Sequence, residues 1–144
     1  MTINALRMLQ SADILRARLS GEFSSVHGIS VNEYFMLLHL QKASKRRLTR
    51  VELAKRMHVS ASTITRMAAP MEKIGLLDRL VDTRDARQAF VVLTDAGESK
   101  LEEANATFVK QSGYIFEDRW SNEDSVQFSQ YLFRLVSRNP ANLT

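Results

Sequence analysis

Apolar side chains recur at the spacing of an α-helix over both ends of the chain. Residues 3–25 predict one long helix. Its apolar positions are Ile3, Leu6, Leu9, Leu15, Leu19 and Phe23. A second long helix is expected from Asp95, with Glu98 as its capping partner. It should run to about Phe116, and a last helix should begin at Ser121. The chain is therefore expected to be mainly helical.

Two capping boxes open shorter helices in the first half of the chain. In "SVNE" and "TRVE", the first side chain can accept a hydrogen bond from the backbone of the fourth residue, whose glutamate can accept one in return. Helices are therefore predicted after Ser30 and after Thr49. The short helix that follows Thr49 should bury one side, supplied by Val51, Leu53 and Ala54.

A tight turn separates this short helix from the next one. Ser60 or Ser62 can cap the second helix, and Gly75 can close it in a left-handed conformation. Two short helices joined by a tight turn form a helix-turn-helix.

The pattern changes from helical to strand-like after the second helix. "LLDRLV" at 76–81 and "QAFVVLT" at 88–94 predict two strands of a hairpin. A hairpin that directly follows a helix-turn-helix is the wing of a winged helix. We therefore predict one domain, mainly α with a small β-hairpin wing (α+β). The winged helix-turn-helix spans 30–95, and a helical dimerisation region is built from 1–29 and 96–144.

Positive charge is concentrated in the middle of the sequence. The 144 residues carry a net charge of +4. Residues 45–87 hold eleven basic and five acidic side chains, whereas 1–44 are close to neutral and 88–144 are net acidic. A basic segment between such flanks suggests a surface that binds a polyanion, and double-stranded DNA is the expected partner.

Composition argues against several other classes of protein. The absence of cysteine excludes disulfides, thiolate metal sites and cysteine nucleophiles. His27, His39 and His58 have no metal-ligand spacing, and no glycine-rich phosphate loop is present, so we expect no metal, no cofactor and no enzyme. No apolar run approaches the roughly 18 residues of a membrane span, and no signal peptide is recognisable. A cytoplasmic protein without a membrane partner is expected.

Short polar side chains crowd the start of the second helix of the helix-turn-helix. A helix that enters the major groove needs such side chains at its amino end, so that hydroxyl groups reach base edges and the backbone approaches phosphates. Capping the helix is the alternative role, but it accounts for one hydroxyl only. The expected DNA contacts on this helix are Ser60, Ser62, Thr63, Thr65 and Arg66.

Arg84 and Arg87 stand at the tip of the predicted hairpin, each beside an aspartate. A solvated turn is the simplest interpretation of such a segment. In a winged helix, guanidinium groups at this position suit the DNA backbone or a narrow minor groove, which concentrates negative potential. Asp85 can hold Arg87 in a fixed orientation through a charge-assisted hydrogen bond. These three residues are therefore predicted to form a DNA-contacting wing.

Two blocks of sequence, "LTRVELAKRMHVSASTITRMAAPMEKIGLLDR" and "DTRDARQAFVVLTDAG", resemble the MarR family of bacterial transcriptional regulators. The pattern Asp-x-Arg-Asp-x-Arg, followed by apolar alternation and Leu-Thr-x-x-Gly, is the specific part of the resemblance. The resemblance implies a homodimeric, DNA-binding repressor with a winged helix-turn-helix. Pro70 departs from the commonest pattern, because it removes a hydrogen bond within the recognition helix and can kink it.

A homodimer is implied by the resemblance and is supported by the broad apolar stripes of the first helix and the last two. A second copy can bury these stripes; packing within one chain is the alternative. The residues expected at the interface are Leu6, Phe108, Ile115, Phe116, Tyr131, Leu132 and Leu135. A two-fold dimer places its recognition helices about 34 Å apart, one turn of DNA, and therefore demands a near-palindromic operator.

Members of the family often bind small aromatic or phenolic anions between the dimerisation helices and the winged helix, and release DNA when they do. The resemblance makes Arg16, Tyr34 and His39 the candidates to line such a cleft, although ordinary packing or surface roles are the alternative for each. A small aromatic carboxylate or phenolic effector is therefore expected. The rival interpretation of the whole chain is a winged-helix module that binds proteins, which would need an acidic or apolar recognition surface.

Overall fold

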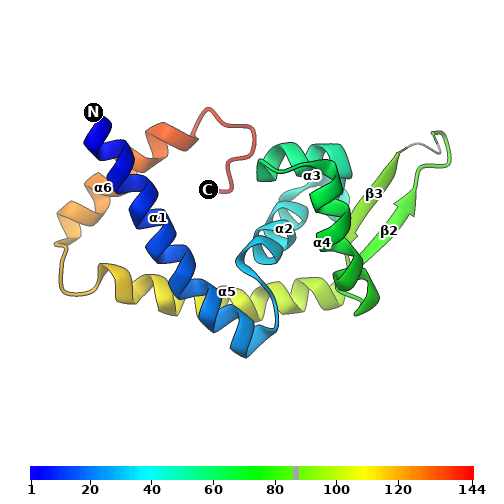
Figure 1. The fold of residues 1–144 in the computed structure, drawn as a ribbon, viewed down its shortest axis with the longest axis horizontal. Coiled ribbons are helices and arrows are strands. Elements are labelled where there is room, and N and C mark those ends of the chain that lie inside the picture. The colour runs from blue at the N-terminus through cyan, green and yellow to red at the C-terminus, as the bar shows by residue number, and fades with distance from the viewer. Residues whose placement is uncertain (86–87) are drawn as a thin grey trace.

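A computed structural model describes residues 1–85 and 88–144 (Figure 1). The elements, in chain order, are α1 (Thr2–Glu22), the π-helical turn η1 (Phe23–His27), α2 (Val31–Lys42), the 3-10 turn η2 (Ser44–Arg46), β1 (Arg47–Thr49), α3 (Arg50–Met57), α4 (Ala61–Lys73), β2 (Leu77–Val81), β3 (Ala89–Leu93), α5 (Asp95–Phe116) and α6 (Asn122–Val136). The expected class, mainly α with a small β wing, is confirmed. Within the described residues, no helix has the length and apolar character needed to cross a membrane.

Side-chain caps fix where the helices begin. The capping boxes predicted at Ser30 and Thr49 are both present, and a third opens α6 at Ser121. The prediction that Asp95 caps α5 is wrong. Thr94 is the cap, because its hydroxyl accepts a hydrogen bond from the backbone of Gly97 at 3.0 Å.

The wing belongs to a three-stranded antiparallel sheet with the order β1-β3-β2. β2 and β3 are the two strands expected from the sequence, and Leu77 faces Leu93 in their register. β1 was not expected, because three residues are too few to show an alternating pattern. It pairs with β3 so that Leu48 lies opposite Val91, and both side chains are buried. β1 thereby attaches the wing to the start of α3.

The hydrophobic core surrounds α2, whose Leu37 and Leu40 are fully buried. α4 and α5 add fully buried side chains to the same cluster, among them Ile64 and Leu101. One expectation for α3 is wrong: Val51 is 56% exposed. The buried residues of α3 are Leu53 and Ala54, while Met57 packs against the core. Val51 falls outside the face centred on Leu53 and Met57, because it lies about 160° and about 120° around the helix from these two residues.

A close junction fixes the end of the recognition helix to the start of α5. The Thr94 hydroxyl lies 2.6 Å from the Gly75 carbonyl oxygen and 2.9 Å from that of Leu76, and it donates its hydrogen there. Gly75 has φ +83°, a conformation that favours glycine and turns the chain from α4 into β2. Gly97 is buried in the first turn of α5, directly against the Leu76 carbonyl. The "LTDAG" segment thus joins the wing, α4 and α5 in one small contact.

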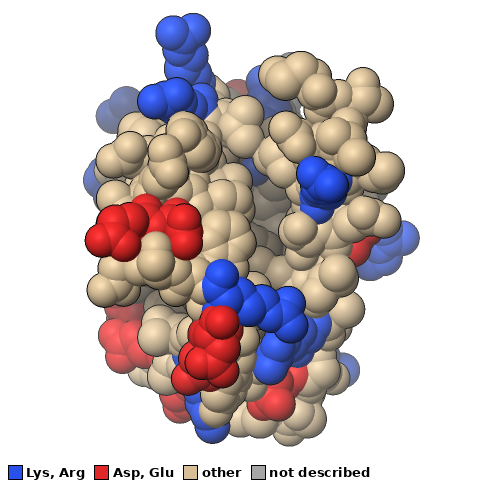
Figure 2. All heavy atoms as spheres, turned by 90° about the vertical axis from the view of Figure 1, so that its left-hand side faces the viewer, with Lys and Arg blue, Asp and Glu red and all other residues tan. Residues whose placement is uncertain are grey.

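α5 runs along one side of the molecule and connects the winged helix with the end formed by α1 and α6 (Figure 1). At that end α6 buries none of its residues. Most of the surface seen from this end is uncharged, with a few basic and acidic side chains between (Figure 2). Large apolar side chains of α6, among them Tyr131, Phe133 and Leu135, are therefore exposed at this end.

Candidate nucleic-acid interface

α3 and α4 form the helix-turn-helix that the sequence predicts. His58 ends α3 in a left-handed conformation with φ 56°, and the Val59 N–H donates to the Ala54 carbonyl at 3.0 Å. α4 then begins after Ser60 and buries Ile64, Ala68 and Met71. These residues recur at helical spacing, so the opposite side of α4 faces solvent. Pro70 lies inside α4, which remains one continuous helix from Ala61 to Lys73.

Three hydroxyl groups lie together at the amino end of α4. The Ser60 hydroxyl accepts a hydrogen bond from the Thr63 backbone at 3.2 Å and lies 3.0 Å from the Ser62 hydroxyl and 2.8 Å from that of Thr63. Ser60 and Ser62 are exposed and Thr63 is half-buried. One serine therefore caps the helix, as expected, and Ser62 remains on the surface beside it. Arg66 is also exposed, one turn further along.

The Thr65 hydroxyl lies outside this cluster and bonds to two other groups of the chain. It donates to the Ala61 carbonyl at 3.2 Å and accepts from the Arg50 guanidinium at 3.0 Å. Arg50 was not among the residues expected to contact DNA. The sequence offers one indication of such a role, because Arg50 is a basic residue directly after the Thr49 cap, in the first turn of the first helix of the helix-turn-helix.

The hairpin tip is shaped by Asp82. Its carboxylate accepts a hydrogen bond from the Arg84 backbone at 2.9 Å, while its own N–H donates to the Gln88 carbonyl at 3.0 Å. Arg84 is exposed at this tip, as predicted. Arg87 lies outside the described residues, as does the expected contact between it and Asp85. The described part of the wing therefore presents Arg84 to solvent at its tip, and Arg79 on β2 is exposed as well.

A hollow of about 340 Å³ is lined by residues of α1 and α2, by the end of α3 and by the segment after α6. Two of the three expected effector residues, Arg16 and His39, line it. Tyr34 does not. It is buried against α5, where its hydroxyl donates to the Asn105 side-chain oxygen at 2.5 Å and its ring stacks on Phe108. Burial raises the pKa of Tyr34 to about 12, so the group stays protonated.

The chemistry of this hollow is basic and partly aromatic. Arg16 donates to Asn32 at 2.8 Å and lies over the Phe35 ring. His39 is buried, and its Nδ1 has no hydrogen-bond partner among the described residues. Burial and the neighbouring charges of Arg56 and His58 lower the pKa of His39, which favours the neutral ring. The hollow is thus lined by the cation of Arg16, the aromatic ring of Phe35 and the buried ring of His39.

The segment after α6 forms one wall of the same hollow. Asn139, Asn142 and Leu143 are among its lining residues. The Lys42 ammonium group donates to the Leu143 carbonyl and ties this segment to the end of α2. The last residues of the chain therefore lie against the winged helix.

Five of the seven residues expected at a dimer interface are exposed in the single chain. Each has at least 37% of its surface accessible: Leu6, Phe116, Tyr131, Leu132 and Leu135. Phe108 and Ile115 are half-buried. Phe108 packs within its own chain, as the alternative interpretation had it, because α5 turns its ring toward Tyr34 at a centroid distance of 5.6 Å.

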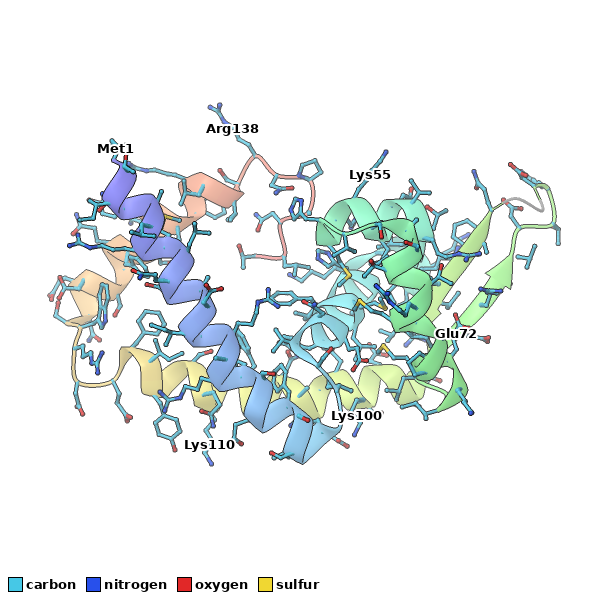
Figure 3. The ribbon with its side chains drawn as sticks, in the orientation of Figure 1. Met1, Lys55, Glu72, Lys100, Lys110 and Arg138 are labelled. Atoms are coloured by element: carbon cyan, nitrogen blue, oxygen red, sulfur yellow. The ribbon has the colours of Figure 1, made fainter. Side chains whose placement is uncertain are left out.

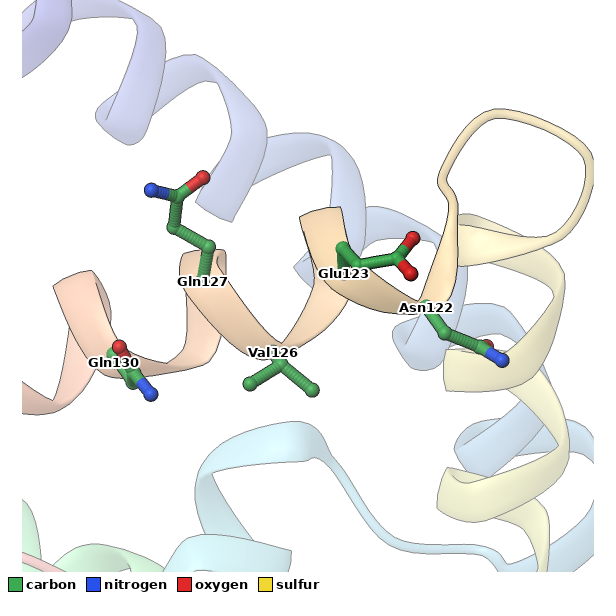
Figure 4. Close-up of a pocket in the computed structure, with 5 residues that line it drawn as sticks. All are labelled: Asn122, Glu123, Val126, Gln127 and Gln130. Atoms are coloured by element: carbon green, nitrogen blue, oxygen red, sulfur yellow. The ribbon is translucent and has the colours of Figure 1, made fainter.

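A second hollow, of about 440 Å³, lies along α6 (Figure 4). The residues that line it are Asn122, Glu123, Val126, Gln127 and Gln130. They come from one helix and include no basic side chain, so this hollow is no candidate for binding DNA. No cluster of three potential metal ligands occurs in the part of the chain that the structure describes.

The helix-turn-helix, its hydroxyl-lined second helix and the three-stranded wing define a winged helix-turn-helix protein. Residues 29–89 match the MarR family. The chain is 30% identical over 126 residues to the uncharacterized HTH-type transcriptional regulator YwoH of Bacillus subtilis, covering 88% of each protein. The chain belongs to the MarR family.

Other relatives and solved structures agree with this family. The chain is 30% identical over 111 residues to the HTH-type transcriptional repressor YetL of Bacillus subtilis, covering 77% of this chain and 66% of YetL. The chain spans about half to two thirds of the length of YetL and of two other Bacillus subtilis relatives, MdtR and YwaE. Among solved structures, Sco3205, a MarR family regulator from Streptomyces coelicolor in complex with DNA, has a TM-score of 0.79 and 25% identity, covering 94% of this chain and 84% of Sco3205.

Proposed function

We propose that the protein is a homodimeric transcriptional repressor that binds a near-palindromic operator through the exposed side of α4 and the wing. The observation that carries this proposal is the set of polar side chains at the amino end of α4, Ser60, Ser62, Thr63 and Arg66, beside a wing that presents Arg84. Helices of this kind read base edges in the major groove, and wing arginines suit the minor groove or the backbone.

Three further observations support DNA as the partner. The basic residues are concentrated in the segment that forms this surface. Sco3205, which has the same fold, was solved with DNA, and YetL is named a repressor. In a bacterial cell, a regulator of this kind acts in the cytoplasm, where the chromosome lies.

Arg66→Ala is expected to relax base preference more than it weakens nonspecific binding. An arginine that reaches a guanine edge contributes about 1–3 kcal/mol of discrimination at that position. Operator sequences are first selected from random duplexes with the parent protein, and affinities for the selected and scrambled duplexes are then compared. Lys73→Ala, which removes one charge from the other end of α4, is the matched control. An equal loss on both duplexes would assign Arg66 to a phosphate instead.

We further propose that an aromatic carboxylate or phenolic ligand binds the hollow lined by Arg16 and His39 and lowers DNA affinity. A ligand that prefers a dimer with misplaced recognition helices must weaken DNA binding through linkage. The cation of Arg16 and the rings of Phe35 and His39, which line the hollow, suit such a ligand. CouR of Rhodococcus jostii, which has the same fold, was solved with p-coumaroyl-CoA.

A thermal-shift screen of hydroxybenzoic and hydroxycinnamic acids, followed by competition against operator DNA, tests this second proposal. At least one compound should both raise the melting temperature and displace DNA. Arg16→Gln should weaken both effects, because the exposed arginine supplies the cation. If no compound does both, the ligand part of the proposal is wrong, while DNA binding is untouched.

A further inference from the structure

The contact between Arg50 and Thr65 joins the two helices of the helix-turn-helix, and both residues are half-buried. A threonine hydroxyl has one hydrogen to donate and two lone pairs to accept with. Thr65 uses its hydrogen for the Ala61 carbonyl and one lone pair for the Arg50 guanidinium. Only one lone pair of the Thr65 hydroxyl therefore remains for a contact with a base edge.

A hollow of about 260 Å³ lies beside this contact, between the starts of α3 and α4 and the start of β3, next to the turn of the wing. The residues that line it are Thr49, Arg50, Val51, Ala61, Ser62, Thr65, Gln88 and Ala89. These side chains offer hydroxyl, amide and guanidinium groups, and none of them is acidic. A hollow of this composition suits a negatively charged group.

The Arg50 guanidinium has donors to spare for such a group. Arginine carries five N–H donors. Among the described residues, one of them donates to the protein, to Thr65, and none of the ion pairs involves Arg50. Its side chain is nevertheless half-buried and held in one direction. A guanidinium that is held in advance loses less conformational freedom when it binds.

We propose that Arg50 binds a backbone phosphate of the operator and that Thr65 is its positioning residue. A phosphate is the expected target because the first helix of a helix-turn-helix crosses the DNA backbone, whereas the second enters the groove. The inference rests on the proposed DNA-binding function and adds one contact to it.

The test measures binding of the selected operator and of a scrambled duplex at several salt concentrations. In the proposed dimer, Arg50→Ala removes one phosphate contact in each half. It should weaken binding to both duplexes roughly 100-fold, about tenfold for each lost hydrogen bond to a charged group. It should also reduce the salt slope by about two. Lys110→Ala is the matched control, because Lys110 is exposed on α5, away from the winged helix (Figure 3), and its loss should change neither value.

The role of Thr65 is tested by three further variants. Thr65→Val, which keeps the shape but removes the hydroxyl, should weaken both duplexes by a smaller factor and leave the salt slope unchanged. Thr65→Ser should behave as the parent. In the double variant Arg50→Ala/Thr65→Val, the valine should add nothing to the effect of the alanine, because a positioning residue acts only through the group that it positions. Melting temperatures of all variants verify that they fold.

Three results would overturn the inference. The first is that Arg50→Ala binds both duplexes as tightly as the parent does. The second is that it loses affinity for the operator alone, which would make Arg50 a residue that reads a base. The third is that Thr65→Val further weakens binding when Arg50 is already replaced by alanine. In each case the parent still binds DNA and the proposed function stands. If the parent itself binds neither duplex, the proposed function fails instead.

Discussion

Gly97→Ala is expected to lower the free energy of unfolding by about 3 kcal/mol, the upper part of the range for overpacking a core. A Cβ atom at this position would lie 2.1 Å from the Leu76 carbonyl oxygen and 2.7 Å from a methyl carbon of Leu93. The carbonyl is backbone and also accepts a hydrogen bond from Thr94, so it cannot move aside freely. Urea denaturation at one fixed protein concentration measures the change.

Gly113→Ala is the control, because it places the same methyl group on the same helix, where no described atom beyond the neighbouring residues and the helix's own backbone lies within 4 Å. Alanine favours the helix over glycine by roughly 0.5–1 kcal/mol, so this variant should match or exceed the parent in stability. Equal denaturation midpoints for the two variants would show that the junction between α5 and β2 is looser than described.

Leu135→Asp is expected to convert the dimer to monomers and to lower operator affinity at least about 100-fold. Leu135 is 61% exposed on α6, and in the proposed dimer a second copy covers it. A buried carboxylate without a partner strongly disfavours association. A monomer then engages one half-site at a time and loses the high effective concentration that a linked second half-site provides.

Sedimentation velocity and operator titration measure the two effects in the same samples. Ile74→Asp is the control: it removes an exposed aliphatic side chain in the winged-helix half, 68% accessible, and should leave the dimer intact. A dimeric Leu135→Asp variant with unchanged affinity would place the interface elsewhere on the chain.

Local signals in the sequence sufficed for most of the fold. Ser30 and Thr49 cap helices because a hydroxyl and a glutamate three residues on act within one turn, without help from distant residues. Gly75 is equally local, since its positive φ follows from the end of α4. The start of α4 and the turn of the wing could be predicted for the same reason, because helix caps and turns also depend on neighbouring residues.

Contacts between distant segments account for what the sequence did not predict. β1 is a strand because it pairs with β3, where Leu48 lies opposite Val91. Tyr34 was expected in a cleft, but the aromatic pattern of α2 could not show that its ring meets Phe108 on α5. The bond between Arg50 and Thr65 likewise joins two helices, and its geometry depends on the packing between them. Spacing along one helix carries no information about which neighbour each face meets.

The salt dependence of DNA binding by the parent protein tests the central claim most directly. A dimer that holds DNA through Lys and Arg on the winged helix should lose affinity steeply as salt rises. The slope of log K against log salt should be steeper than about −4, as when at least about five phosphates are neutralised, and the selected operator should bind more tightly than a scrambled duplex at every salt concentration. A slope near zero, or equal affinity for the two duplexes, would contradict a DNA-binding repressor and favour a winged helix that binds another protein.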